Sequence, residues 1–177
     1  GAFKGCTALT NMTIPESVTT IGESAFVGCT ALTTVIINGL VTEIEDWMFK
    51  GCSALTSVTL PDSVTYIHGI VFHGCSALAT VTIPDSVDGF GEGVFIDCSA
   101  LTAVTIPALV TEIKHSMFSG FSALATVTFS GSVGWFDPDN GAFGGCSALT
   151  IVIFSGSVNN FEVGDFEYCS ALTTVSI

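Results

Sequence analysis

Cysteines are the residues of this chain whose type and spacing could do chemistry. A disulfide, a metal site or a thiol nucleophile each needs partners that converge on one point. A period of 23 residues instead indicates a coil of stacked turns, which spaces the thiols along a line. We therefore expect a buried ladder of reduced thiols, with pairing of adjacent cysteines or metal binding as alternatives. Seven cysteines occupy this one slot of the repeat: Cys6, Cys29, Cys52, Cys75, Cys98, Cys146 and Cys169.

Three histidines are further candidates for catalysis or metal binding. His68 and Lys114 share one slot of the repeat, and His115 occupies the next slot. These slots vary from turn to turn, so His68, His73 and His115 are expected to face solvent on the return side. No Ser/His/Asp or Cys/His set stands out from residues that are common along the chain. We therefore expect a protein that is not an enzyme and that carries no cofactor.

Two acidic segments are candidates for binding a cation. An insertion of two residues breaks the repeat at residues 137–141, Asp-Pro-Asp-Asn-Gly. Asp137, Asp139 and Asn140 are weak calcium candidates through their oxygens. The downstream acid of an EF-type loop is missing, however, and Asp-Pro and Asn-Gly are ordinary turn formers, so a bulged loop is favoured. The second segment, Glu43 to Asp46, is expected to be either a solvated edge or a binding site.

The elements that position these residues repeat with the same period. Eight copies align on the cysteine slot, in which Phe121 replaces one cysteine. The stretch Leu-x-x-Val-x-Ile alternates apolar and polar residues, as a strand with one buried face does, and stacked turns of this kind form a parallel sheet. Ser-Val-Thr-x-Ile predicts a second short strand on the return side. Gly-x-x-Ala-Phe-x-Gly-Cys predicts a tight helical turn that closes each coil.

Residues 49–67 carry a family resemblance. Their pattern, Phe-x-Gly-Cys-x-Ala-Leu-Thr-x-Val-Thr-Leu-Pro-x-Ser-Val-Thr-x-Ile, closely resembles the BspA-like leucine-rich repeat, also called the Treponema pallidum type, and the resemblance covers essentially all 177 residues. It implies a right-handed leucine-rich-repeat solenoid of the α/β horseshoe class, dominated by β-structure. Such repeats occur in surface and secreted proteins of bacteria and protists that serve in adhesion and binding, and the family offers no catalytic residues.

The chain is expected to form a single solenoid domain, residues 1–177, of eight repeats of about 23 residues with no internal linker. Solenoids need polar capping turns at their ends. The first residues lie in mid-repeat and the last ones in a strand, so neither end looks capped. We therefore expect a fragment of a longer repeat protein, or ends that contact neighbouring subunits.

The charge of the chain narrows its partners. The formal net charge is −13, from 16 acidic residues against three lysines. Such a field repels phosphate backbones and anionic lipid surfaces, so we expect no nucleic acid and favour a cationic partner or divalent ions. Residues 115–136 and 140–161 lack formal charges and are long enough to suggest a membrane span. They keep the phase of the repeat, so no span is expected.

The outward slots that flank the buried valine column form a candidate binding face. Threonine is a favourable strand residue and belongs to the repeat consensus, but its regular array also resembles the face of ice-binding solenoids. A sequon at residues 11–13 makes Asn11 a candidate glycosylation site. The face comprises Thr13, Thr34, Thr59, Thr80, Thr82, Thr105, Thr126 and Thr128.

The sequence therefore predicts a non-catalytic binding, adhesion or scaffold protein. Its rigid repeat surface would recognise a protein or a cell-surface ligand, at the cell surface or outside the cell. Two alternatives stay open. One is binding of ice or mineral surfaces through the threonine array, and the other is a structural subunit that packs by its ends or edges.

Overall fold

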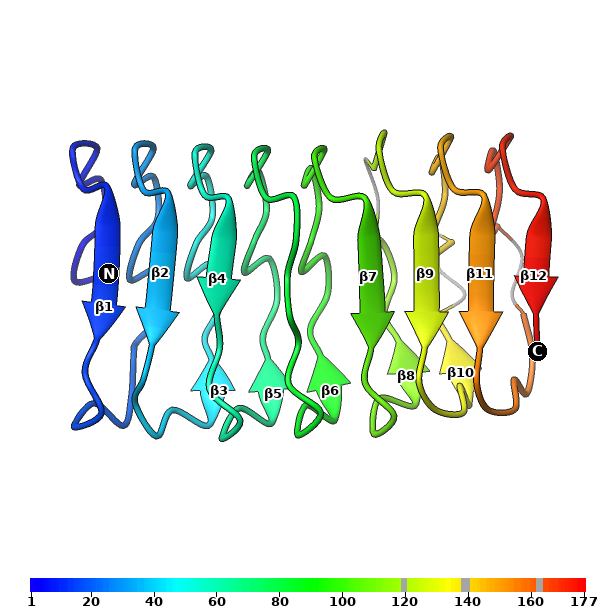
Figure 1. The fold of residues 1–177 in the computed structure, drawn as a ribbon, viewed down its shortest axis with the longest axis horizontal. Helices are drawn as coiled ribbons and strands as arrows, with labels where there is room; N and C mark the ends of the chain where they lie inside the picture. Colours follow the sequence, from blue (N-terminus) through cyan, green and yellow to red (C-terminus); the bar gives the residue numbers. More distant parts are fainter. Residues whose placement is uncertain (119–120, 138–140, 162–163) are drawn as a thin grey trace.

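A computed structural model describes residues 1–118, 121–137, 141–161 and 164–177. They form a parallel β-solenoid of about seven turns, with strands side by side in a nearly straight row (Figure 1). Each turn advances the coil by about one strand spacing, ~4.8 Å. The expected solenoid of parallel strands is confirmed, but the expected eight repeats make about seven turns, because the residues at each end complete only part of one.

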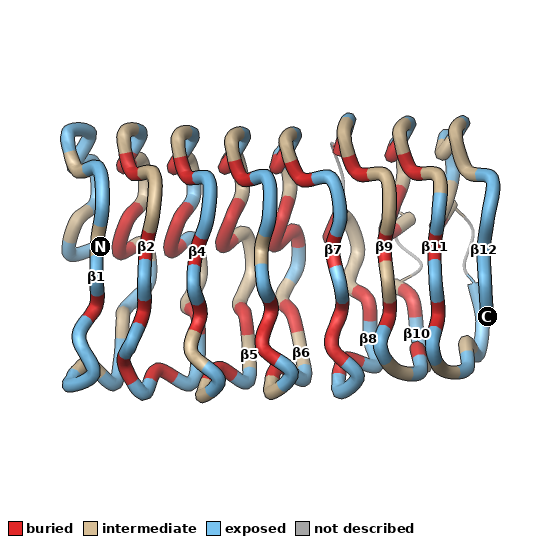
Figure 2. Tube along the Cα trace, in the orientation of Figure 1, coloured by how far each residue is buried: buried red, intermediate tan, exposed pale blue. Residues whose placement is uncertain are grey.

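One face of the solenoid, which we call the front sheet, is built from the strands expected of Leu-x-x-Val-x-Ile. Equivalent residues of successive turns lie opposite each other, as Met12 does with Val35 and Val104 with Val127. Their side chains alternate between the core and solvent, which aligns the buried positions in bands across the turns (Figure 2). The strands are β1 (Asn11–Ile14), β2 (Thr34–Ile37), β4 (Ser57–Thr59), β7 (Ala103–Ile106), β9 (Thr126–Phe129), β11 (Ile151–Phe154) and β12 (Thr174–Ser176).

The predicted second strands form a return sheet on another side of the coil. Each has two residues, the first facing outward and the second buried in the core, as Glu43 and Ile44 do in β3. Hydrogen bonds join β3, β5 and β6 into one sheet and β8 and β10 into another. The strands are β3 (Glu43–Ile44), β5 (Tyr66–Ile67), β6 (Gly89–Phe90), β8 (Glu112–Ile113) and β10 (Trp135–Phe136).

The segment before each cysteine slot contains no helix in the described part of the chain, so the expected helical turns are not found. Isolated bonds of the i to i−3 kind close these segments, such as Val27 N to Ser24 O at 3.3 Å and Cys29 N to Phe26 O at 3.1 Å. Ser24 has a φ of 58° and Gly28 one of 71°, both in the left-handed region. Two such residues so close together prevent right-handed helical dihedrals from propagating.

A column of stacked phenylalanine rings runs through the core. Neighbouring rings have centroids 4.8 to 6.1 Å apart and planes within 10° of each other. Each contact adds about 0.5–1.5 kcal/mol to the burial of the ring itself. The column comprises Phe3, Phe26, Phe49, Phe72, Phe95, Phe118, Phe143 and Phe166.

The front sheet is interrupted at residues 80–83, although their sequence fits the strand pattern. Among the described residues, no backbone hydrogen bond joins this segment to β4 or β7, and the sheet divides into three strands before it and four after it. Val81 is consequently half-buried, whereas Val58 and Val104 in the neighbouring turns are buried. The pattern therefore predicted the direction of the side chains correctly and the pairing wrongly.

Prolines at the strand exits account for part of this interruption. Elsewhere an N–H just after the strand bonds to the preceding turn, as Asn38 N does to Ile14 O at 3.0 Å. Pro61, Pro84 and Pro107 occupy that place in three successive turns and have no N–H to donate. Residues 80–83 lie in the middle turn of the three, so the closing bond is missing on both sides.

We predict faster hydrogen exchange at residues 80–83 than at β9, measured by mass spectrometry on overlapping peptides. The amides of β9 lie in ladders to both β7 and β11, whereas those of residues 80–83 have no ladder. Local opening at residues 80–83 should therefore need less free energy, with exchange at least about tenfold faster. Equal protection of the two segments would show that residues 80–83 pair in solution.

We predict that Phe72→Ala lowers the free energy of unfolding by about 3–5 kcal/mol. Phe72 is fully buried, and its ring stacks on both Phe49 and Phe95. Urea unfolding followed by far-UV circular dichroism measures the change. Phe161→Ala is the control and should cost clearly less, because Phe161 is 45% exposed. A similar cost for the two variants would contradict the stacked column.

Candidate functional site

The cysteine ladder is a structural element of the core. Each buried thiol donates to the carbonyl oxygen of the phenylalanine one turn back, as Cys52 Sγ does to Phe26 O at 3.1 Å. Burial raises the pKa of the Cys52, Cys98 and Cys146 thiols to about 12, because a buried thiolate loses its hydration. Such thiols are poor nucleophiles and poor metal ligands.

All seven cysteines are free thiols. The predicted buried ladder is confirmed for five of them and fails at Cys6, which is exposed. Phe121 is buried in the same column and packs at a tilt against Phe118, with centroids 5.7 Å apart. The five buried members are Cys29, Cys52, Cys75, Cys98 and Cys146.

The histidines lie at the surface beside acidic residues, as expected of variable return-side slots. His115 lies between Glu92 and Asp137, with nitrogen to oxygen distances of 3.7 and 3.6 Å. His73 Nε2 is 4.0 Å from Asp97 Oδ2. These pairs hold surface side chains in place.

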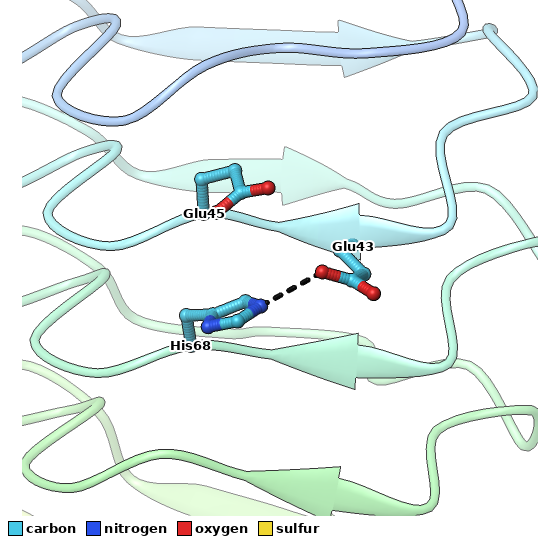
Figure 3. A group of neighbouring side chains, drawn as sticks. All are labelled: Glu43, Glu45 and His68. Atoms are coloured by element: carbon cyan, nitrogen blue, oxygen red, sulfur yellow. Dashed lines mark hydrogen bonds and ion pairs between the residues drawn. The ribbon is translucent and has the colours of Figure 1, made fainter.

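A third histidine forms the one group of possible metal ligands in the described part of the chain. Glu43 lies in β3, Glu45 just after β3 and His68 just after the neighbouring β5, with ligand atoms within 4.8 Å of one another (Figure 3). Two carboxylates and an imidazole are a donor set that suits zinc or nickel. His68 Nε2 is already 2.9 Å from Glu43 Oε2, so a metal would have to displace this ion pair. The predicted third acid, Asp46, instead accepts a hydrogen bond from Gly69 N at 2.8 Å.

The calcium candidates are only partly described. Asp139 and Asn140 lie outside the described residues. Asp137 has a largely buried side chain, and its carboxylate faces His115 Nδ1. Calcium binding at this loop stays a prediction.

The candidate threonines lie on the outward side of the front sheet, where they do not form a continuous face. Ile36 stands between Thr13 and Thr59 in the register and is 43% exposed. Thr80 and Thr82 lie on the segment that leaves the ladder, and a hollow of about 370 Å³ opens between this segment and β7. The candidate residues therefore do not form one regular array.

The glycosylation candidate lies on β1. Asn11 is exposed, and its Oδ1 accepts a hydrogen bond from Thr34 Oγ1 at 2.6 Å. Glycosylation of Asn11 stays a prediction.

The return sheet carries an indentation that the sequence reading did not identify. Its outward slot holds Glu43, Tyr66, Glu112 and Trp135 in β3, β5, β8 and β10, but β6 has Gly89 there. Two hollows of about 230 and 370 Å³ adjoin at this place, and Tyr66 and Lys114 line both. We call these two hollows together the return-face recess.

Glycines create the recess by bringing neighbouring turns close together. A Cβ on Gly91 would lie 2.4 Å from Gly69 N, so a side chain there would collide with the backbone of the turn before. A Cβ on Gly89 would lie 2.6 Å from Cε2 of Tyr66, whose ring leans over that position. On the far side β6 and β8 do not pair, which leaves the recess open between them.

Aromatic side chains flank the recess. Trp47 lines the larger hollow, and Trp135 lies beyond Lys114 on β10; they are the two tryptophans of the chain. Their exposures are 39% and 38%, high for residues of this size. The Tyr66 ring meets His68 edge-on, with centroids 4.9 Å apart.

The recess is acidic. Asp46 and Glu92 line the larger hollow, Asp88 and Glu112 line the smaller one, and Lys114 is the one lysine beside them. Lys114 Nζ lies 3.0 Å from Glu112 Oε2 and 5.5 Å from the centre of the Trp135 ring. The hydrogen bond to Glu112 is the main reason why the pKa of Lys114 is raised. The arrangement suits binding and offers no activated nucleophile.

The signal for this recess was present in the sequence. Residues 89–93 read Gly-Phe-Gly-Glu-Gly, and two of these glycines stand in slots that hold large side chains in the turns on either side. The closeness of Tyr66, Lys114 and Trp135 follows only from the stacking of the turns.

The comparisons with known proteins agree with this architecture. A family model described as the BspA type leucine-rich repeat region matches residues 1–125 and 71–177, which together span the chain. The chain belongs to the BspA-type leucine-rich repeat family. No curated protein matches it.

Solved structures show the same fold. This BspA-type chain superimposes on the T. pallidum leucine-rich repeat protein with a TM-score of 0.80 and 28% identity, over 93% of this chain and 78% of that one. A Bacteroides ovatus leucine-rich repeat protein gives 0.76 and 29%, over 94% and 42%. A leucine-rich cell surface protein of Faecalibacterium prausnitzii gives 0.72 and 32%, over 94% and 47%. The chain thus spans less than half of the last two proteins.

The described residues include no helix that is long and apolar enough to cross a membrane. The two uncharged stretches identified in the sequence supply strands and turns of the solenoid wherever they are described.

We predict that Ellman's reagent titrates one thiol rapidly in the native protein and all seven after denaturation. Cys6 is exposed and should react fast, and half-buried Cys169 should react more slowly. The five buried thiols should stay unreactive, because they are covered and because their raised pKa suppresses the thiolate. Cys6→Ser should remove the fast phase. A fast phase that survives in this variant would contradict the ladder.

Proposed function

We propose that this BspA-type chain is a non-catalytic recognition module that binds partner proteins through the return-face recess. The observation that carries the proposal is the pair of adjoining hollows flanked by exposed tryptophans. Aromatic residues are enriched at protein interfaces and supply much of their binding energy. The stacked core holds these side chains on rigid turns, which limits the entropy lost on binding.

The front sheet offers less for recognition. Its outward residues are mostly threonine and serine, without an aromatic anchor among the described residues of β1, β2, β4, β7 and β9. Ile36, Ile151 and Ile153 supply exposed aliphatic area on this face, and the hollow beside residues 80–83 has no aromatic or charged side chain in its lining. The recess combines concavity, aromatic area and charge in one place.

A location at the cell surface or outside the cell is part of the proposal. The F. prausnitzii relative is described as a cell surface protein, and this chain covers 47% of it. Adhesion through partner proteins would suit such a location.

Two other functions compete with this one. Ice or mineral binding would use the threonine face, in which Ile36 replaces one threonine and residues 80–83 do not pair with their neighbours. A role as a structural subunit would use the ends or edges of the solenoid. Freezing hysteresis that Thr126→Tyr abolishes would favour the first, and concentration-dependent association in light scattering would favour the second.

We predict that peptides selected from a random display library bind at the recess. Gly89→Leu should weaken their binding at least about tenfold, because the leucine fills the smaller hollow; fluorescence anisotropy measures the affinity. The backbone should tolerate the change, since equivalent slots hold Tyr66 and Glu112 and the clash falls on the movable Tyr66 ring.

The matched control is Ala103→Leu, which places the same side chain at an exposed slot of the front sheet. It should leave the peptide affinity unchanged. Far-UV circular dichroism and thermal unfolding establish that both variants are folded. Selected peptides that ignore Gly89→Leu, or that lose affinity only in Ala103→Leu, would overturn the recess as the binding surface.

A further inference from the structure

We infer that the return-face recess binds an extended segment of a partner protein that presents lysine or arginine side chains. This inference rests on the proposed function and adds the chemistry of the partner. It follows from three features of the recess: its charge, the place of Lys114 within it, and the size of its two hollows.

Charge complementarity is the first feature. Four carboxylates line the two hollows against one ammonium group, and the whole chain has a net charge of −13. Glu43 and Glu45 add negative charge next to His68 (Figure 3). His68 is part of the lining of the larger hollow. An approaching cationic side chain is attracted and oriented by such a field, and an anionic one is repelled.

Lys114 shows that the recess stabilises an alkylammonium group. Its Nζ is held between the Glu112 carboxylate at 3.0 Å and the face of the Trp135 ring at 5.5 Å. A cation within about 6 Å of an indole ring is attracted by the electrons of the ring. Lys114 lines both hollows, so it is also a competitor that a partner's cation would meet.

The larger hollow also has aromatic and acidic side chains in its lining. Trp47 and Tyr66 supply aromatic surface there, and Glu92 supplies a carboxylate. The hollow measures about 370 Å³ and the smaller one about 230 Å³, near the lower limit of small-ligand pockets. Two small adjoining hollows fit successive side chains of an extended chain better than one large ligand.

Tryptophan fluorescence tests the inference directly, because both tryptophans of the chain flank the recess. The probe is the blocked peptide Gly-Lys-Gly-Lys-Gly, and its control is the same peptide with both lysines Nε-acetylated. The lysine peptide should change the fluorescence saturably, and its binding should weaken several-fold in high salt. The acetylated peptide should bind at least about tenfold more weakly.

Removal of the internal competitor gives the sharpest result. Lys114→Met keeps an apolar side chain, frees Glu112 and Trp135, and should tighten binding of the lysine peptide several-fold. Lys50→Met makes the same change in net charge at an exposed site that lines neither hollow, so it should have little effect. Equal effects of the two variants would overturn the inference, because they would show that Lys114 acts only through the net charge of the protein and does not compete for the recess.

Neutralising the recess should act in the opposite direction. Asp88→Asn combined with Glu92→Gln should weaken binding of the lysine peptide at least about tenfold. Glu16→Gln combined with Asp62→Asn removes the same charge from exposed positions outside the recess and should change the affinity little.

Other outcomes overturn the inference as well. One is equal binding of the acetylated peptide, and another is the absence of any saturable response to the lysine peptide. Binding of a neutral oligosaccharide such as cellohexaose in place of the peptide would assign the recess to a glycan. Display-selected peptides that require the hollow at Gly89 but carry no cation would overturn this inference and leave the proposed function intact.

Discussion

Each turn advances by one strand spacing, so the equivalent side chains of successive turns stack on one another. The rest of the structure depends on this stacking. A single turn has two short strands and cannot bury its own apolar face, so its stability comes from its neighbours. In the phenylalanine column the stacked rings are nearly parallel, and in the leucine and valine columns most of the aliphatic groups are buried. Each buried cysteine adds a hydrogen bond to the turn before it.

The same constraint explains why the fourth cysteine-containing turn is the unusual part of the molecule. Proline at three successive strand exits removes closing bonds on both sides of residues 80–83, and the front sheet opens there. In the same turn Gly89 and Gly91 remove two outward side chains, and the return sheet stops pairing between β6 and β8. Buried columns and the connecting turn, through bonds such as Phe72 N to Val94 O at 2.8 Å, hold the turns together.

Aromatic and charged side chains also lie together around this irregular turn. An ordinary turn presents one acid or one aromatic residue per outward slot, and its neighbours crowd it. Because Gly89 and Gly91 carry no side chains, the Tyr66 ring lies over Gly89, and two adjoining hollows remain that Tyr66 and Lys114 both line. Four carboxylates from three turns line these hollows: Asp46 beside β3, Asp88 and Glu92 beside β6, and Glu112 in β8. The loss of two outward side chains thus gives this repeat protein a distinct recess on its surface, while its core stays the same.

The sequence by itself determined the columns. A period of 23 residues, an alternating strand and a fixed aromatic slot were enough to predict stacked parallel strands, a second short strand and a buried thiol ladder, because burial depends on pattern. Strand pairing depends on backbone geometry, so residues 80–83 have the sequence pattern of a strand but do not pair as one. The segments before the cysteines were expected to be helical turns, but they contain residues with left-handed dihedrals, such as Ser24 and Gly28. The recess at Tyr66, Gly89 and Lys114 also needed the tertiary structure. These residues are 23 or more positions apart in the sequence. Only the register of the stacked turns places the Tyr66 ring and the charged Lys114 beside Gly89, which has no side chain.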